Sequence, residues 1–138
     1  GGGLALAALI QGSGLSRHIG ELLVGIAGWP PVAVTAVVVL VILFWTELTS
    51  NVATAATFMP VLAAMATATG QPVIELLAPA AVAASCAFML PVGTAPNAIV
   101  YGSGRVRIRD MMRAGFVVDI LAWGVIMVVA GATLRWLS

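Results

Sequence analysis

The chain has 138 residues, of which 62% are hydrophobic and only 8% charged, whereas soluble domains have about 45–50% apolar residues. Three stretches without a charged residue run from 22 to 46, from 48 to 74 and from 76 to 104. Each is longer than the ~20 residues that cross a bilayer. The composition predicts an all-α integral membrane protein and excludes a soluble domain.

The charged residues argue against several classes of protein. The net charge of +1 leaves no basic face for nucleic acid. With one cysteine, Cys86, and one histidine, His18, no cysteine or histidine metal site can be built. An intramembrane aspartyl enzyme would need two converging acids, and Glu47 and Asp119 stand in unlike sequence contexts. We therefore expect no enzyme, and partners limited to lipid, other helices and a small solute.

Residues 1–11 are expected to form the end of a transmembrane helix. Residues 12–29 place apolar side chains on one helical face and Arg17, His18 and Glu21 on the other, the pattern of a helix that lies at the membrane interface. Trp29 and the prolines after it are expected to end this helix.

Residues 32–69 contain two apolar arms, 32–48 and 53–69, joined by a polar tip. Two interpretations are open. The arms are either two full spans with a turn in water, or a re-entrant hairpin whose tip stops near the midplane. The charge of the loops cannot separate them, because both return the chain to the side from which it came.

Residues 75–104 form one long apolar segment that is interrupted between Pro91 and Asn97. Proline and glycine there break helical hydrogen bonds, so we expect two half-helices, the first finishing near Leu90, with unwound backbone between them. A last transmembrane helix is expected at 111–137.

Arginines crowd the connection before this last helix, at positions 105, 107, 109 and 113. By the positive-inside rule, residues 104–112 are cytoplasmic and the carboxyl terminus lies on the outer side. The membrane is expected to be the cell (inner) membrane. Trp29 and Trp136 then fall at the outer interface, and Tyr101 near the inner one.

The polar tip and the break share one chemistry. Helices that begin after Asn51 and near Asn97, with Ser50, Asn51, Thr94 and Asn97 as caps, present free N–H groups and positive dipole ends to an anion. The carbonyls at the ends of the preceding half-helices, with the oxygens of Thr46 and Asn51, suit a small cation such as Na⁺. Together they outline a coupled transporter. Alternatives are a passive anion channel or facilitator, a structural membrane subunit, or a tip that is only a solvent-exposed turn.

Two acids lie in the apolar segments, where a functional role is the first interpretation. We expect Glu47 to be a structural, hydrogen-bonded glutamate rather than a proton carrier. For Asp119 we expect snorkelling toward the cytoplasmic face or a hydrogen bond.

Two motifs resemble the divalent-anion/sodium symporter family. ASCAFMLPVGTAPNAIV, residues 84–100, is similar to its signature, and TELTSNVATAATFMPVL is similar to its second Ser-Asn-Thr hairpin. The resemblance implies two inverted repeats, homodimers and an elevator motion. This chain resembles the second, carboxyl-terminal repeat: interfacial arm helix, re-entrant hairpin, broken helix and last span. The amino-terminal repeat is absent from it, so we expect no transport by this chain alone.

The resemblance also implies roles for individual residues. The sodium ligands would be Thr46, Thr49, Asn51 and the backbone of Gly93. The substrate would be met by Ser50, Asn51, Val52, Thr94 and Ala95, with Asn97 supporting them. Val52 stands where the family usually has a hydroxyl, which favours di- and tricarboxylates such as succinate over sulfate. The expected function is therefore sodium-coupled secondary transport of such anions.

Overall fold

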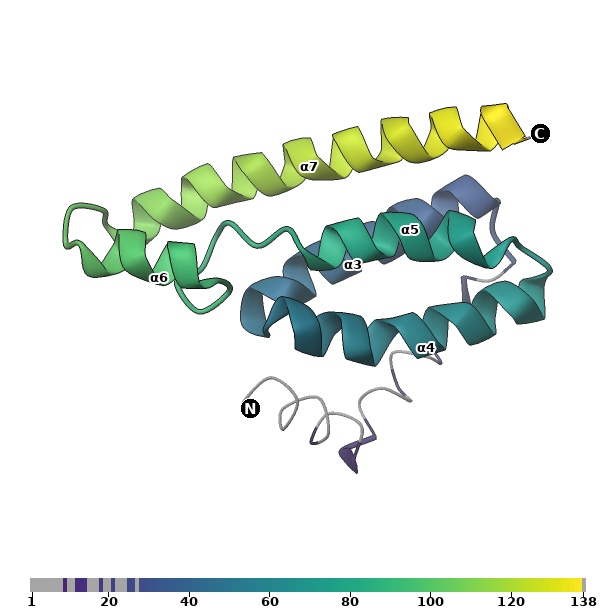
Figure 1. Cartoon of the computed structure of the whole chain (residues 1–138), viewed down its shortest axis with the longest axis horizontal. Coiled ribbons are helices and arrows are strands. Elements are labelled where there is room, and N and C mark those ends of the chain that lie inside the picture. Colours follow the sequence, from purple (N-terminus) through teal and green to yellow (C-terminus); the bar gives the residue numbers. More distant parts are fainter. Residues whose placement is uncertain are drawn as a thin grey trace.

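The computed structural model describes residues 28–137 together with residues 9, 12–14, 18, 21, 25 and 26. Its helices are α3 (Pro31–Leu48), α4 (Asn51–Thr69), α5 (Val73–Ala84), α6 (Ala95–Gly102) and α7 (Ile108–Leu137) (Figure 1). The described part contains no strand, which confirms the predicted all-α class. The helix end expected at 1–11 and most of the interfacial helix expected at 12–29 lie outside the described residues.

Three of these helices are long and apolar enough to cross a membrane: α3, α4 and the segment Ile108–Thr133 of α7. Much of the outer face of α7 is apolar and exposed, with Leu121, Val125 and Val128 more than half exposed. A helix that presents such side chains suits a lipid environment or contact with further membrane helices. These features agree with an integral membrane protein.

The helix boundaries follow from local sequence. Pro31 stands in the first turn of α3, where its missing N–H costs nothing. Gly70 ends α4 with φ +70°, and its N–H bonds the carbonyls of Ala66 and Thr67, a left-handed cap that favours glycine. The turn expected at 70–72 is confirmed, because α5 begins directly after it.

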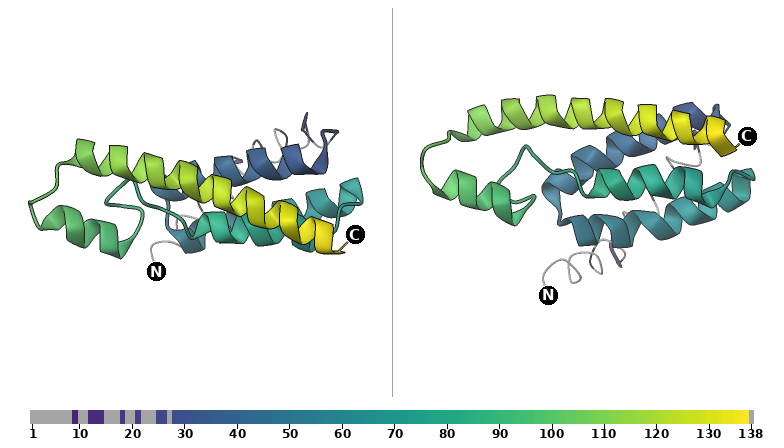
Figure 2. Two further views of the ribbon diagram at one scale, coloured as in Figure 1. Left: turned by 90° about the horizontal axis from the view of Figure 1, so that it is seen from above. Right: turned by 45° about the horizontal axis from the view of Figure 1, so that its top comes forward.

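The core forms where α3, α4 and α5 pack together and α7 packs on α3 and α5 (Figure 2). Branched side chains of α3 meet Phe58 and Leu62 of α4, while α5 contributes mainly alanines. Because alanine is small, the α5 backbone comes close to both neighbours. The side chains in this cluster are Val34, Val38, Val39, Ile42, Leu43, Phe58, Leu62, Met65, Ala66, Leu76, Ala80, Ala83, Ala84 and Ile126.

The long apolar segment is interrupted at residues 85–94, between α5 and α6. The sequence placed the end of the first half-helix near Leu90, but α5 ends at Ala84. The reason is distant in sequence: backbone N–H groups of residues 88–90 bond the Glu47 carboxylate of α3 instead of the preceding helical turn. Helix α6 has no buried residue and lies beyond the end of the α3–α5 bundle, beside the first part of α7 (Figures 1 and 2).

Helix α7 begins at Ile108, slightly before the expected start at 111. Its buried residues include Met111, Gly115, Asp119, Ile126 and Ala130, which recur at helical spacing and therefore share one face. This face packs on α3 and α5, so the polar Asp119 is carried into the interior.

Candidate functional site

The turn between α3 and α4 is held by its own side chains. The Ser50 hydroxyl caps α4 by accepting a hydrogen bond from the N–H of Ala53 at 3.2 Å, as the sequence predicted. The Thr49 hydroxyl donates to the carbonyl of Trp45 at 3.3 Å and lies 2.7 Å from the Thr54 hydroxyl. The tip is therefore a rigid, internally bonded turn.

A group of oxygen atoms gathers where this tip meets the end of α5. The Thr46 hydroxyl lies 2.9 Å from the Asn51 side-chain oxygen and 2.9 Å from the carbonyl of Ala84. One hydroxyl proton cannot serve both acceptors fully, so the group is rich in lone pairs. The Asn51 amide donates to the Ser85 carbonyl at 3.5 Å. Thr46 is fully buried, and such neutral oxygens are the ligands that a hard cation prefers.

The structure brings two of the four predicted sodium ligands, Thr46 and Asn51, into this oxygen group. The hydroxyl of Thr49 is instead directed to Trp45 and Thr54. Gly93 lies beside the Glu47 carboxylate, where an added Cβ would come within 3.4 Å of Glu47 Oε2 and 3.1 Å of the Ala87 Cβ. Thr49 and Gly93 could therefore each offer a cation a backbone carbonyl but no side-chain oxygen.

Glu47 organises the break between α5 and α6. Its Oε1 accepts the N–H groups of Phe88 at 2.5 Å and Met89 at 2.9 Å, and its Oε2 accepts that of Leu90 at 2.8 Å. The residue is 3% exposed. The three backbone donors satisfy the hydrogen-bonding capacity of this buried carboxyl group. The prediction of a structural, hydrogen-bonded glutamate is confirmed.

Asn97 closes the other side of the break. Its side-chain amide donates to the carbonyls of Ala87 at 2.9 Å and Leu90 at 3.0 Å. Its backbone N–H donates to the Thr94 hydroxyl at 3.4 Å, so Thr94 caps α6 as predicted, whereas the Asn97 side chain braces the unwound backbone. The start of α6 is therefore fixed to the break that precedes it.

The predicted substrate residues lie at two helix starts. Ser50, Asn51 and Val52 belong to the first turn of α4, and Thr94 and Ala95 to that of α6. Both helices begin at the same end of the α3–α5 bundle (Figures 1 and 2). Val52 is 62% exposed and Ala95 is also exposed, so these positions are open to a solute or to further protein.

Two residues of α7, neither of them predicted as a site residue, support the site. At Gly115 an added Cβ would overlap the Phe88 carbonyl and the Met89 Cα, so only glycine allows α7 to touch the unwound backbone. Asp119, one turn later, is 1% exposed and adjoins Glu47. Of the two alternatives expected for Asp119, snorkelling is wrong, because the side chain is buried. The regular spacing of Met111, Gly115 and Asp119 is the sequence signal that could have placed them on the buried face.

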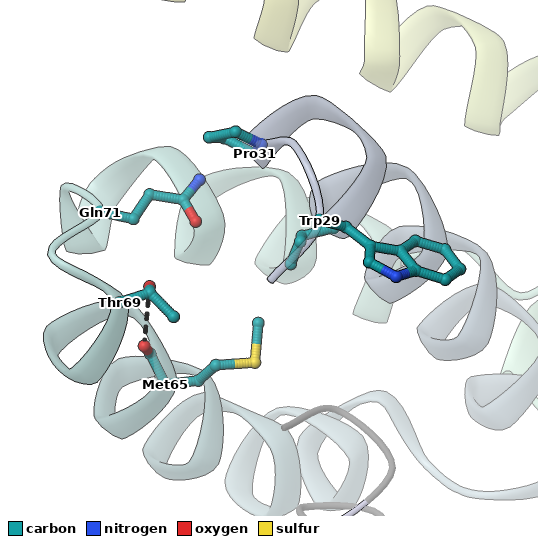
Figure 3. A pocket seen from close by; sticks show the side chains of 6 residues that line it. Trp29, Pro31, Met65, Thr69 and Gln71 are labelled. Atoms are coloured by element: carbon teal, nitrogen blue, oxygen red, sulfur yellow. Dashed lines mark hydrogen bonds between the residues drawn. The ribbon is translucent and has the colours of Figure 1, made fainter. Parts of the chain in front are cut away.

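A cavity of about 120 Å³ lies at the opposite end of the bundle (Figure 3). Its lining is Trp29, Pro31, Val34, Met65, Thr69 and Gln71. It has no charged side chain, and the Thr69 hydroxyl already donates to the Met65 carbonyl at 3.0 Å. The chemistry for binding ions is therefore concentrated at the tip and the break, away from this cavity.

Comparison with known proteins identifies the family of the chain. Residues 1–138 match the family described as the sodium:sulfate symporter transmembrane region. The chain is 48% identical over 129 residues to the sodium-dependent dicarboxylate transporter SdcS of Staphylococcus saprophyticus, covering 94% of this chain and 25% of that protein. SdcS of Staphylococcus aureus (strain USA300) is 47% identical over the same length and with the same shares. The chain thus spans about a quarter of the length of these relatives, which are transporters and not enzymes.

Proposed function

This chain belongs to the sodium:sulfate symporter family, and from that premise we propose that it provides part of the site of a sodium-coupled symporter for dicarboxylate-like anions. The observation that carries the proposal is that two hydroxyl-capped helix starts and a cluster of neutral oxygens lie at the same end of the bundle (Figure 1). The relatives named as sodium-dependent dicarboxylate transporters support the same assignment.

The cation half of the site uses the oxygen group at the tip. Thr46 and Asn51 would hold Na⁺ with their side-chain oxygens, and Thr49 and Gly93 would contribute backbone carbonyls. The chemistry of the donors fits, because hydroxyl, amide and carbonyl oxygens are all neutral and hard. Na⁺, when bound, would supply positive charge for the anion and couple its uptake to the sodium gradient.

The anion half uses the starts of α4 and α6. Ser50, Asn51 and Thr94 offer polar side chains, and the backbone at Val52 and Ala95 adds N–H groups in the first helical turns. The arginines of the described residues are all at exposed positions, so among these residues the groups that would balance the substrate carboxylates are helix ends and Na⁺.

The placement of the tip supports a re-entrant hairpin over two full spans. Glu47, at the end of α3, adjoins Asp119, which lies close to the middle of the span Ile108–Thr133. Helix α7 continues past the tip and along α6 (Figure 1). A tip that meets α7 halfway along its length would lie near the midplane of the bilayer, where symporters of this architecture bind their solutes.

The remaining features rest on the family resemblance. We propose an elevator-type motion in a homodimer, with residues 104–112 cytoplasmic and the carboxyl terminus outside. Because the relatives are about four times longer than the matched segment, the rest of the transport site would come from a second repeat, and this segment would not transport alone.

The test is uptake of radiolabelled succinate by proteoliposomes that carry the full-length protein, with and without an inward sodium gradient. We expect accumulation above equilibrium only with the gradient, and stronger competition by citrate than by sulfate. Uptake that equilibrates without sodium would replace the proposal with a facilitator or channel. No uptake of any of these anions would assign the tip a structural role.

A further inference from the structure

The side chain of Asn97 reaches back from the first turn of α6 to the unwound segment that precedes this helix. Its amide nitrogen lies 2.9 Å from the carbonyl oxygen of Ala87 and 3.0 Å from that of Leu90. Carbonyl oxygens only accept hydrogen bonds, so both hydrogens of the amide are used on the backbone of the break. One half-buried side chain thereby binds residues that lie ten and seven positions earlier in the chain.

These bonds enclose the turn that contains Gly93. The Leu90 carbonyl also accepts the N–H of Gly93 at 3.2 Å, so both of its lone pairs are occupied. On the other side of Gly93, the Thr94 hydroxyl accepts the backbone N–H of Asn97 at 3.4 Å. The buried Gly93 is therefore held between two residues that both bond to Asn97.

Two side chains thus hold different parts of the break. Glu47 binds the N–H groups of residues 88–90, before the turn. Asn97 binds on both sides of the turn, at Leu90 and at Thr94. Because both bonds of its amide lead out of α6, they position the turn and do not contribute to the helix itself.

We propose that Asn97 is a positioning residue that presents the backbone carbonyl of Gly93 to Na⁺ and thereby sets the sodium affinity of the site. This inference rests on the proposed function, in which Gly93 contributes that carbonyl. Without the two amide bonds, residues 91–93 populate other arrangements, and Na⁺ binds only the fraction of molecules in which the carbonyl is in place. Two hydrogen bonds of ordinary strength should change the apparent sodium affinity by at least about fivefold.

The effect on the anion is expected to be small. Thr94 and Ala95 belong to the start of the helix that Asn97 ties to the break. A replacement of the Asn97 side chain nevertheless keeps the bond from its backbone N–H to the Thr94 hydroxyl. The loss should therefore appear in the sodium dependence, whereas the affinity for succinate at saturating sodium stays close to that of the wild type.

The first test is a sodium titration of the full-length protein in detergent without substrate, with potassium replacing sodium at constant ionic strength. The unfolding temperature reports binding, because a ligand that binds only the folded state stabilises it. Asn97→Leu keeps the approximate shape of the side chain but has no donor, and the fitted dissociation constant for sodium should rise at least about fivefold. Asn97→Gln keeps the amide group and should lie closer to the wild type. A rise in Asn97→Gln as large as in Asn97→Leu would contradict a role of the donors.

Leu76→Val is the control for stability, because Leu76 is fully buried near the start of α5, at the other end of this helix from the break. It should lower the unfolding temperature at every sodium concentration and leave the dissociation constant unchanged. An unchanged constant in Asn97→Leu, beside a wild type that sodium stabilises, would overturn this inference and leave the proposed function standing. A wild type that sodium does not stabilise would contradict the proposed function, and this inference with it.

The second test is succinate uptake by proteoliposomes that carry the full-length protein. Asn97→Leu should need at least about fivefold more sodium for half-maximal uptake, while its KM for succinate at saturating sodium stays within about twofold of the wild type. Asn97→Ser, which keeps one shorter donor, allows both tests if the leucine variant does not fold. A higher KM for succinate with an unchanged sodium requirement would place Asn97 in the anion half of the site and overturn the inference.

Discussion

The turn at Thr49 and Ser50 and the break at residues 85–94 both expose backbone polar groups among apolar helices, and they are held in different ways. The turn is short, and hydroxyls from its own neighbourhood satisfy it. The break is long, and three helices shape it: Glu47 of α3 binds three of its N–H groups, Asn97 of α6 donates to two of its carbonyls, and Gly115 lets α7 approach it. The turn is a local structure, whereas the break depends on the tertiary fold.

This difference predicts that substitutions on other helices that contact the break cost more stability than substitutions of the capping residues in the turn. The variants are compared in the full-length protein. Stability is measured as the unfolding temperature in detergent, above which the protein no longer gives a monodisperse peak.

The largest effect is expected for Glu47→Ala. It leaves three buried N–H groups without an acceptor, and at about 1–3 kcal/mol for each such group the loss should be at least about 3 kcal/mol. The control is Glu75→Ala in the first turn of α5, where the loss of a favourable helix-dipole contact should cost at most about 1 kcal/mol. Equal unfolding temperatures for the two variants would mean that the carboxylate does not hold the break.

Gly115→Ala should have the next largest effect. Its methyl group would overlap the backbone of Phe88 and Met89, and the forced shift should cost about 1–3 kcal/mol. Gly124→Ala is the control on the same helix, because a Cβ there meets nothing within 4 Å, and it should be neutral or stabilise α7 by up to about 1 kcal/mol. If Gly115→Ala is as stable as Gly124→Ala, α7 does not press on the break.

Loss of a helix cap should have a smaller effect. Ser50→Ala and Thr94→Ala each remove one capping hydroxyl, and each should cost about 1 kcal/mol. Ser50→Gly should be milder than Ser50→Ala, since glycine is an acceptable cap. A loss as large as that of Glu47→Ala would show that the turn also depends on distant contacts.

The smallest effect is expected for Val52→Thr. The side chain is 62% exposed, and surface substitutions usually change stability by less than about 0.5 kcal/mol. The added hydroxyl restores the residue that is commoner in the family, so succinate uptake should remain close to that of the wild type. An inactive but well-expressed variant would mean that Val52 packs against a part of the protein that the described residues do not include.

The same contrast explains how much could be predicted from the sequence. The hairpin arms, the turn at 70–72 and the caps at Ser50 and Thr94 depend on neighbouring residues, and they were predicted. The end of α5 was placed near Leu90, because Pro91 and Gly93 are the visible helix breakers. The helix ends at Ala84, since the carboxylate that binds the next N–H groups lies on another helix.

The arrangement of the site shows the same limit. Thr46 and Asn51 were predicted as a pair and lie together. The contact between Glu47 and Asp119 joins residues far apart in the chain, and no local pattern indicates it. The spacing of Gly115 and Asp119 indicates only that both lie on one face of a predicted helix, the face of α7 that is buried against the site.

The most direct test of the central claim, that the tip binds an anion beside Na⁺, is sodium-dependent succinate uptake by Asn51→Asp, with Val52→Thr as the control in the adjacent position. A new negative charge at the start of α4 should repel the substrate, so the account predicts uptake at background for Asn51→Asp and close to wild type for Val52→Thr. Near-normal, sodium-dependent uptake by a well-expressed Asn51→Asp variant would contradict it.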